Sequence, residues 1–136
     1  MQWSQASAAH REALWNCLPE SILDYLQLHP TVVSGVDISY LANIATDMPS
    51  RTLPEVLAAT RLLGGIAEDG FARRETVLPH ILYILTLAHP AVRTAAAEAI
   101  WQIGDRSVID ALRSALERET HPHTRLTMEH VLRVLG

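Results

Sequence analysis

The chain has 136 residues, enough for one domain with its own hydrophobic core but hardly for two. Its hydrophobic fraction is 49% and its aromatic fraction only 5%, so the core has to be built from Leu, Ile, Val and Ala, as in closely packed helices. The formal net charge is −4, and all eleven basic residues are arginine. A mildly acidic chain without basic runs lacks the charge footprint of a nucleic-acid-binding protein.

Cysteine content and hydropathy restrict the chemistry and the compartment. The single cysteine, Cys17, excludes an intramolecular disulfide and a cysteine-based zinc site. No apolar run approaches the roughly 20 residues needed to cross a bilayer, and the N-terminal stretch lacks the basic flank and apolar segment of a secretory signal. We therefore expect a cytoplasmic protein without a membrane partner. The absence of lysine indicates GC-rich coding, and we interpret it as a sign of a bacterial source.

The beginning of the sequence is predicted to be helical. Apolar residues at spacings of three and four predict helices over 4–18 and 20–28. The second helix ends before His29-Pro30, because the residue preceding a proline is pushed out of the helical region. The β-branched residues and glycine of 31–37 indicate an extended connector, with a short strand as the alternative. We expect residues 1–30 to form a helical pair that caps one end of the fold.

Capping residues mark the next two helices. Asp37 is predicted to be the N-cap of a helix whose apolar residues extend over 38–45. Thr52 and Glu55 have the Thr-x-x-Glu spacing of a capping box. They are predicted to begin a helix over 53–66.

The second half of the chain is more regular. Its apolar spacing predicts helices over 76–87, 91–103, 108–118 and 122–135. The dipeptide His-Pro precedes the second and the fourth of these helices, where proline suits the first helical position. Gly104 fits the C-terminal end of a helix, and Asp105 is a suitable cap for the one that follows.

Two stretches of this half resemble each other. HPAVRTAAAEAIWQIGD starts at His89, and its imperfect copy HPHTRLTMEHVLRVLG starts 32 residues later at His121. A recurrence of about 20 to 50 residues is typical of stacked repeats, in which each helical pair buries its apolar face against its neighbours. The repeat unit is a helix, a turn marked by His-Pro, a second helix and a glycine. Two clear units are predicted over 76–104 and 107–136, and a diverged one over 38–67.

The stretch VRTAAAEAIWQIGD resembles a HEAT repeat of the short bacterial type, which also occurs in phycobilin-lyase-like proteins. The resemblance rests on Val92, Arg93, Ala96, Ala97, Ala99, Ile100, Ile103, Gly104 and Asp105, and it continues at Val108, Ile109 and Leu112. It implies an all-α fold, an α-α superhelix (solenoid) of three to four HEAT-like helical hairpins, in a single domain over 1–136. It also implies a binding scaffold. In the family, an arginine at the positions of Arg93 and Arg125 usually joins a polar ladder between repeats.

The sequence departs from the family pattern at three places. His89 and His121 stand where an acidic residue is usual, and Trp101 stands where glycine is usual. On a helical wheel, the stacking face of 91–103 is formed by Val92, Ala96, Ala99 and Ile103. The opposite arc holds Thr94, Ala97, Glu98 and Trp101.

Trp101 is therefore the centre of the predicted binding surface. An exposed indole is a good anchor for a partner, because tryptophan and arginine dominate interface hot spots. Burial of Trp101 against a neighbouring helix or loop is the alternative. The predicted protein-binding surface follows the successive second helices and consists of Arg61, Glu98, Trp101, Glu129 and Arg133.

Other chemistries have little support in the sequence. The histidines suggest a metal site at His121 and His123 with Glu117, Glu119 or His130, but His spacings of three or four residues are missing. Gly64-Gly65 is an isolated pair, interpreted as loosening a helix end rather than binding phosphate. No nucleophile–base set is recognisable. Arg73-Arg74 with Arg51 and Arg61 is too small a set for a DNA-binding groove.

These observations together predict a non-enzymatic protein–protein interaction module with no cofactor and no metal. Its partner is expected to be another protein and not a nucleic acid. The size of the chain suits a dedicated bacterial partner, such as an adaptor or a toxin-immunity protein. The alternative is a lyase- or chaperone-like helper for a tetrapyrrole-carrying protein.

Overall fold

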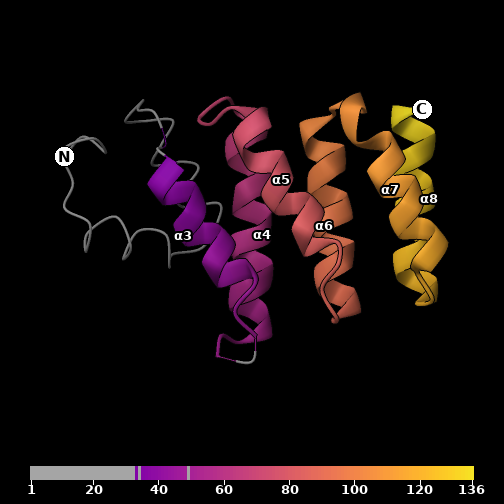
Figure 1. Ribbon diagram of the computed structural model, residues 1–136, viewed down its shortest axis with the longest axis horizontal. Coiled ribbons are helices and arrows are strands. Elements are labelled where there is room, and N and C mark those ends of the chain that lie inside the picture. The colour runs from indigo at the N-terminus through magenta and orange to yellow at the C-terminus, as the bar shows by residue number, and fades with distance from the viewer. Residues whose placement is uncertain (1–32, 34, 49) are drawn as a thin grey trace.

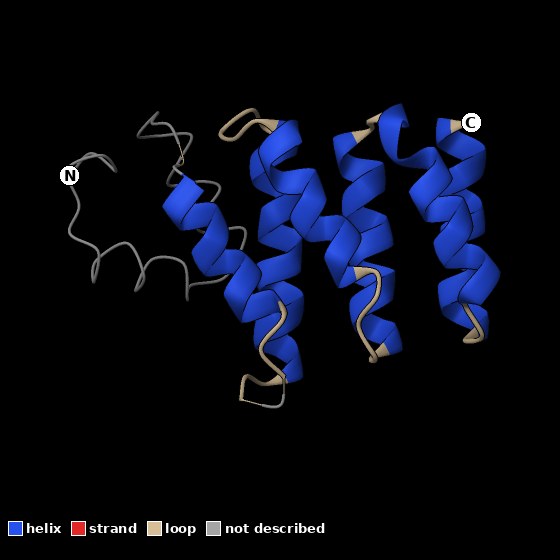
Figure 2. Cartoon of the chain, viewed as in Figure 1, coloured by secondary structure: helices blue, strands red, loops and turns tan. Residues whose placement is uncertain are grey.

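The computed structural model describes residues 33, 35–48 and 50–136 of the chain (Figure 1). All regular structure in these ranges is helical (Figure 2). The elements are α3 (Gly35–Ala45), α4 (Leu53–Glu68), α5 (Arg74–Ile84), α6 (Pro90–Ile103), the short 3-10 turn η2 (Arg106–Val108), α7 (Ile109–Arg118) and α8 (Pro122–Leu135). The helices predicted over 4–18 and 20–28, with Cys17, lie outside the described residues.

The helices form consecutive hairpins that stack along the long axis of the molecule (Figure 1). Each hairpin pairs a first helix with a second one: α3 with α4, α5 with α6, and α7 with α8. The second helices form a layer of their own, in which α4 packs on α6 and α6 packs on α8. This arrangement confirms the predicted α-solenoid. The predicted organisation as a single domain with an N-terminal capping pair stays a prediction.

The start of α3 differs from the sequence-based expectation. The helix begins at Gly35, so Asp37 lies in its first turn and is not the N-cap. A carboxylate in the first turn is favourable because it faces the positive end of the helix dipole. Ahead of the helix, the backbone N–H of Val33 donates to the carbonyl of Phe71 at 3.1 Å, which ties this point of the predicted connector to the loop after α4.

The capping box of α4 is confirmed. The Glu55 N–H donates to Thr52 Oγ1 at 3.4 Å, and the Thr52 N–H donates to Glu55 Oε1 at 3.2 Å. These reciprocal bonds satisfy N–H groups that have no partner inside the helix. The helix then continues to Glu68, two residues beyond the predicted end.

Gly64 has a different role from the predicted one. It lies inside α4, where a Cβ would come within 3.0 Å of the Ala99 Cβ and 3.2 Å of the Ala99 Cα on α6. The glycine therefore sets the close approach of two second helices and does not loosen a helix end. Ala99, the α6 residue on the other side of this contact, is also small and so also allows the two helices to approach closely.

The ends of the helices in the second half follow local hydrogen bonding. α5 begins at Arg74 and ends at Ile84, two and three residues earlier than predicted. Its C-terminal end is fixed by the Thr86 hydroxyl, which donates to the Tyr83 carbonyl at 2.6 Å. α6 begins at Pro90, one residue before the predicted start, and its predicted C-terminal end is confirmed, since Gly104 adopts a left-handed φ of 69°, which favours glycine. Asp105 caps the following turn η2, as predicted, because its Oδ1 accepts from the Ser107 N–H at 2.8 Å.

The core consists of aliphatic side chains, as the composition predicts. Its largest fully buried members are Leu41, Leu62, Leu63, Ile66, Ile81, Ile84, Ile100, Leu112 and Met128. The predicted stacking face of α6 is buried, but Thr94 and Ala97 are buried too and do not share the open arc with Trp101. The reason is that α6 has α4 on one side and α8 on the other, and also contacts α5. Little of α6 besides Glu98 and Trp101 therefore faces outward.

Candidate functional site

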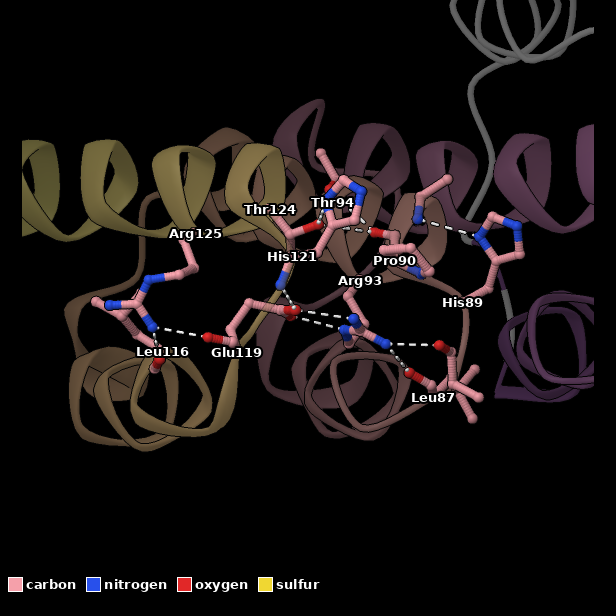
Figure 3. A network of polar contacts seen from close by, with 12 residues as sticks. Leu87, His89, Pro90, Arg93, Thr94, Leu116, Glu119, His121, Thr124 and Arg125 are labelled. Carbon is pink, nitrogen blue, oxygen red and sulfur yellow. Dashed lines mark hydrogen bonds and ion pairs between the residues drawn. The ribbon is translucent and has the colours of Figure 1, made fainter.

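A buried polar network supports the second-helix layer at the N-terminal ends of α6 and α8 (Figure 3). The Arg93 guanidinium donates to both carboxylate oxygens of Glu119, from Nε at 2.7 Å and from Nη2 at 2.8 Å. Its Nη1 donates to the carbonyls of Leu87 and Ala88 at 2.9 and 2.7 Å. One side chain thus joins the loop before α6 to the loop before α8.

Burial makes this ion pair structurally important. The Glu119 side chain is only 2% exposed and that of Arg93 18%. The hydrogen bonds from Arg93 hold the pKa of the Glu119 carboxyl below its ordinary range, while burial acts in the opposite direction. A carboxylate in this position stays charged because its partner is fixed beside it.

Threonines extend the network between the two helices. The hydroxyls of Thr94 on α6 and Thr124 on α8 lie 2.9 Å apart and are hydrogen-bonded. Arg125 repeats part of the arrangement one hairpin later, since its Nη1 donates to the carbonyls of Leu116 and Glu119 at 2.9 and 2.7 Å. Both arginines therefore have the structural position that the repeat pattern implies, because their guanidinium groups donate hydrogen bonds to carbonyls of the chain itself.

The outward face of the second-helix layer carries a hollow of about 710 Å³, here called the Trp101 hollow. Trp101 is 51% exposed beside it, and Leu126 is 64% exposed. Three helices line the hollow: Arg61, Gly65 and Glu68 come from α4, Ala95, Glu98, Trp101 and Gln102 from α6, and His123, Leu126, Thr127, His130 and Val131 from α8.

The hollow continues toward the N-terminal ends of the helices. A second depression of about 410 Å³ shares Arg61, Ala95, Glu98 and His123 with the Trp101 hollow. It extends to His89 and His121, which precede α6 and α8. Together the two depressions form a groove over the second-helix layer.

Three of the five predicted site residues share the Trp101 hollow. Arg61, Glu98 and Trp101 line it together, although they come from two helices. Glu129 and Arg133 are not among its lining residues. Glu129 instead lies 3.7 Å from Arg125 in an ion pair along α8, and Arg133 is exposed in the last turn of that helix.

Comparison with known protein families identifies the repeat. The sequence pattern of HEAT repeats matches residues 41–133, which is more than half of the chain. The chain belongs to the HEAT-repeat family. HEAT repeats generally mediate protein–protein interaction. Searches against curated proteins and solved structures give no match for this HEAT-repeat protein. The narrower resemblance to short bacterial, phycobilin-lyase-like members stays a prediction.

The charged groups of the Trp101 hollow are incompletely paired. Within the described part of the chain, Arg61 and Glu98 each make neither a hydrogen bond nor an ion pair through their side chains. Glu68 is different, because its Oε2 accepts from Gln102 Nε2 at 3.3 Å. An arginine and a glutamate therefore remain free to contact a bound molecule.

Several lining residues of the hollow are not among the five predicted binding residues, although the helical-wheel arc of α8 that carries Glu129 and Arg133 also includes Leu126 and His130. The α8 wall includes His123, Leu126, Thr127 and His130, whose spacings of three and four residues place them on one helical face. That spacing was the available signal, but the face becomes a site only because α6 lies beside it. Among the described residues, no group of three or more His, Cys, Asp or Glu side chains is placed to hold a metal ion. No helix in the described ranges has the length and apolarity to span a membrane.

Proposed function

We propose that this HEAT-repeat protein is a non-enzymatic module that binds another protein through its second-helix face, centred on Trp101. The observation that carries the proposal is the half-exposed indole of Trp101 beside the Trp101 hollow. The stack itself is built by other residues of α6, which are buried. Trp101 is thus a large apolar side chain that the fold leaves in solvent, and such residues are enriched in interface hot spots.

The surface has the composition of a protein interface. The exposed aliphatic Leu126 supplements Trp101, and Arg61 and Glu98 provide unpaired charges around them. Interfaces typically combine an apolar centre with a polar rim. Glu129 and Arg133 stay in the proposal as outer members on α8, beyond the hollow.

The finer role is also a proposal. A small stack of helical hairpins with one binding face suits a dedicated partner, and both an adaptor and a toxin-immunity protein of a bacterium fit this description. We choose neither, because both would use the same face in the same way.

The second candidate is a lyase- or chaperone-like helper for a tetrapyrrole-carrying protein. It is favoured by the volume of the Trp101 hollow, which at about 710 Å³ falls within the range of small-molecule sites, roughly 300 to 1,000 Å³. Its test is the absorbance spectrum of the protein mixed with free bilin. A shifted visible band that Trp101→Ala abolishes supports this candidate, and an unchanged spectrum removes it.

The protein-binding proposal is tested by substitution of Trp101. A partner is first captured from the native host with the full chain and identified by mass spectrometry. Trp101→Ala is expected to weaken its binding by more than about 1 kcal/mol, or more than about fivefold in Kd. The circular dichroism and the melting temperature are expected to stay nearly unchanged because the side chain is half exposed.

Tyr83→Ala is the matched control. Tyr83 is an exposed aromatic residue as well, but it belongs to the first-helix layer, on α5. Its substitution is expected to leave partner binding unchanged. Equal effects of the two substitutions, or a Trp101→Ala protein that binds normally, would contradict the proposed surface.

A further inference from the structure

The two exposed groups of α6 in the Trp101 hollow are chemically complementary to one kind of ligand. Glu98 and Trp101 are three residues apart on α6, so their side chains project from the same face about one turn apart. Glu98 is exposed and its carboxylate has no partner within the described residues. Trp101 presents half of its indole surface to solvent.

A carboxylate beside an aromatic ring is suited to a cation. An ammonium or guanidinium group is attracted to the face of an indole, and the attraction is largest for tryptophan. The same cation forms a charge-assisted hydrogen bond with a carboxylate. A lysine or arginine side chain placed between Glu98 and Trp101 would make both contacts, and its aliphatic stem would pack on the ring.

The other charges around the hollow were weighed on the same basis. Glu68 adds a second carboxylate on α4, whereas Arg61 is the one arginine among the lining residues that the structure describes. His123 and His130 contribute polar rings on α8. The whole chain has a formal net charge of −4, which attracts basic partners over a longer range. The balance around Trp101 therefore favours a cationic ligand, with Arg61 opposing it from α4.

The apolar part of the hollow defines the second feature of the ligand. Leu126, Ala95 and Val131 provide aliphatic surface between α6 and α8. Leu126 is 64% exposed, so covering it removes apolar surface from water. A large apolar side chain is needed to cover it.

We infer that the partner docks through a basic amphipathic segment, which places a large apolar side chain against Leu126 and a lysine or arginine between Glu98 and Trp101. This inference rests on the proposed function and adds the chemistry of the partner. It also assigns opposite effects to the two unpaired charges of the hollow: Glu98 promotes binding and Arg61 selects against excess positive charge.

The experiment uses a random peptide library displayed on phage and selected on the full chain. Peptides of about 16 residues suffice, since as a helix they reach roughly the length of α6. Selections on the Trp101→Ala protein are run in parallel, and peptides common to both are discarded. The remaining peptides are expected to share a large apolar residue and a lysine or arginine at a fixed spacing.

One selected peptide is then titrated against charge variants of the full chain by fluorescence anisotropy. Glu98→Gln is expected to raise Kd about tenfold, and Arg61→Gln is expected to lower it severalfold. Affinity is also expected to fall as salt is added, with a smaller slope in Glu98→Gln. Circular dichroism verifies that each variant is folded.

The outcomes separate the inference from the proposed function. Peptides that depend on Trp101 but carry neutral or acidic side chains overturn the basic-segment inference and leave the binding surface intact. The same holds if Glu98→Gln fails to raise Kd or if Arg61→Gln raises it. A captured native partner that depends on Trp101 while no peptide is selected overturns the inference too, because the recognised element is then not a linear segment. Loss of Trp101 dependence in both experiments overturns the proposed function.

Discussion

Glu119→Gln tests whether the buried network holds neighbouring hairpins together. Three N–H groups point at the Glu119 carboxylate: Nε and Nη2 of Arg93, and the backbone N–H of His121 at 3.1 Å. A glutamine of nearly the same shape offers one acceptor oxygen and places an NH₂ group against at least one donor. The substitution therefore removes hydrogen bonds and the compensating charge without creating a cavity.

The magnitude follows from the burial of the pair. Removal of one partner from a fully buried ion pair costs about 3–5 kcal/mol, because the other charge is left uncompensated. Here Arg93 keeps its bonds to the carbonyls of Leu87 and Ala88, and its side chain is 18% exposed, so part of its charge stays solvated. We expect Glu119→Gln to lower the free energy of unfolding by about 2–3 kcal/mol.

The assay is urea unfolding at pH 7, followed by circular dichroism. The midpoint is expected to fall while the slope with urea stays the same, since the surface exposed on unfolding does not change. Asp110→Asn is the matched control, because its ion pair with Arg113, at 3.3 Å, is exposed on α7. This control is expected to lower the midpoint only slightly, because an exposed ion pair and an exposed first-turn carboxylate each contribute less than about 1 kcal/mol.

A double-mutant cycle with Arg93→Met separates the ion pair from the individual side chains. Methionine keeps an apolar stem and removes the guanidinium. The coupling energy is expected to be roughly 1.5–3 kcal/mol. A coupling energy within about 0.5 kcal/mol of zero, which is the additivity expected of independent sites, would refute the conclusion that this contact joins the hairpins.

Two further predictions concern the same layer. The pKa of the Glu119 carboxyl is lowered from its ordinary value of 4.5. The carboxylate therefore stabilises the fold fully above pH 4.5, and this stabilisation is lost as the pH falls through the lower pKa of the folded state. Urea midpoints measured from about pH 7 to pH 3 should fall in the acid range, and less so in Glu119→Gln. Gly64→Ala should gain about 1 kcal/mol from helix propensity but lose about 1–3 kcal/mol from overpacking against Ala99, so its net effect is expected to lie between about zero and 2 kcal/mol of destabilisation. Gly35→Ala, whose Cβ would meet no atom within 4 Å, is the control, and a stabilised Gly64→Ala protein would show that the approach of α4 to α6 can relax.

Local patterns in the sequence predict much of the fold. The 3.6-residue spacing of apolar residues predicts the helices, and Thr52, Pro90 and Gly104 predict their ends within a few residues. These signals depend only on a residue and its near neighbours in the chain, so they can be interpreted without knowledge of the tertiary contacts. Asp37 and Gly64 were misinterpreted because their roles depend on more than the local pattern.

The candidate site is only partly predictable for the same reason. A helical wheel of α6 places Thr94 and Ala97 beside Trp101, but it carries no information on the helices to either side, and both residues are buried. The carboxylate that pairs with Arg93 lies 26 residues away in sequence, and no spacing rule connects them. The two α8 residues in the predicted surface do not line the Trp101 hollow. Arg133 shares the helical face of Leu126 but lies in the last turn of α8, so its distance along the helix and not its face excludes it.

The second helices run in the same direction, so the helix dipoles make one end of the groove more positive than the other. α4, α6 and α8 begin at the same edge of the layer, so the partial positive charges of their first turns accumulate there, at about half an elementary charge per helix. This partial positive charge disfavours a cation near His89 and His121, which line the same end of the groove. In the proposed binding mode, a basic segment is therefore expected to lie in the groove in one polarity, with its cation toward Trp101.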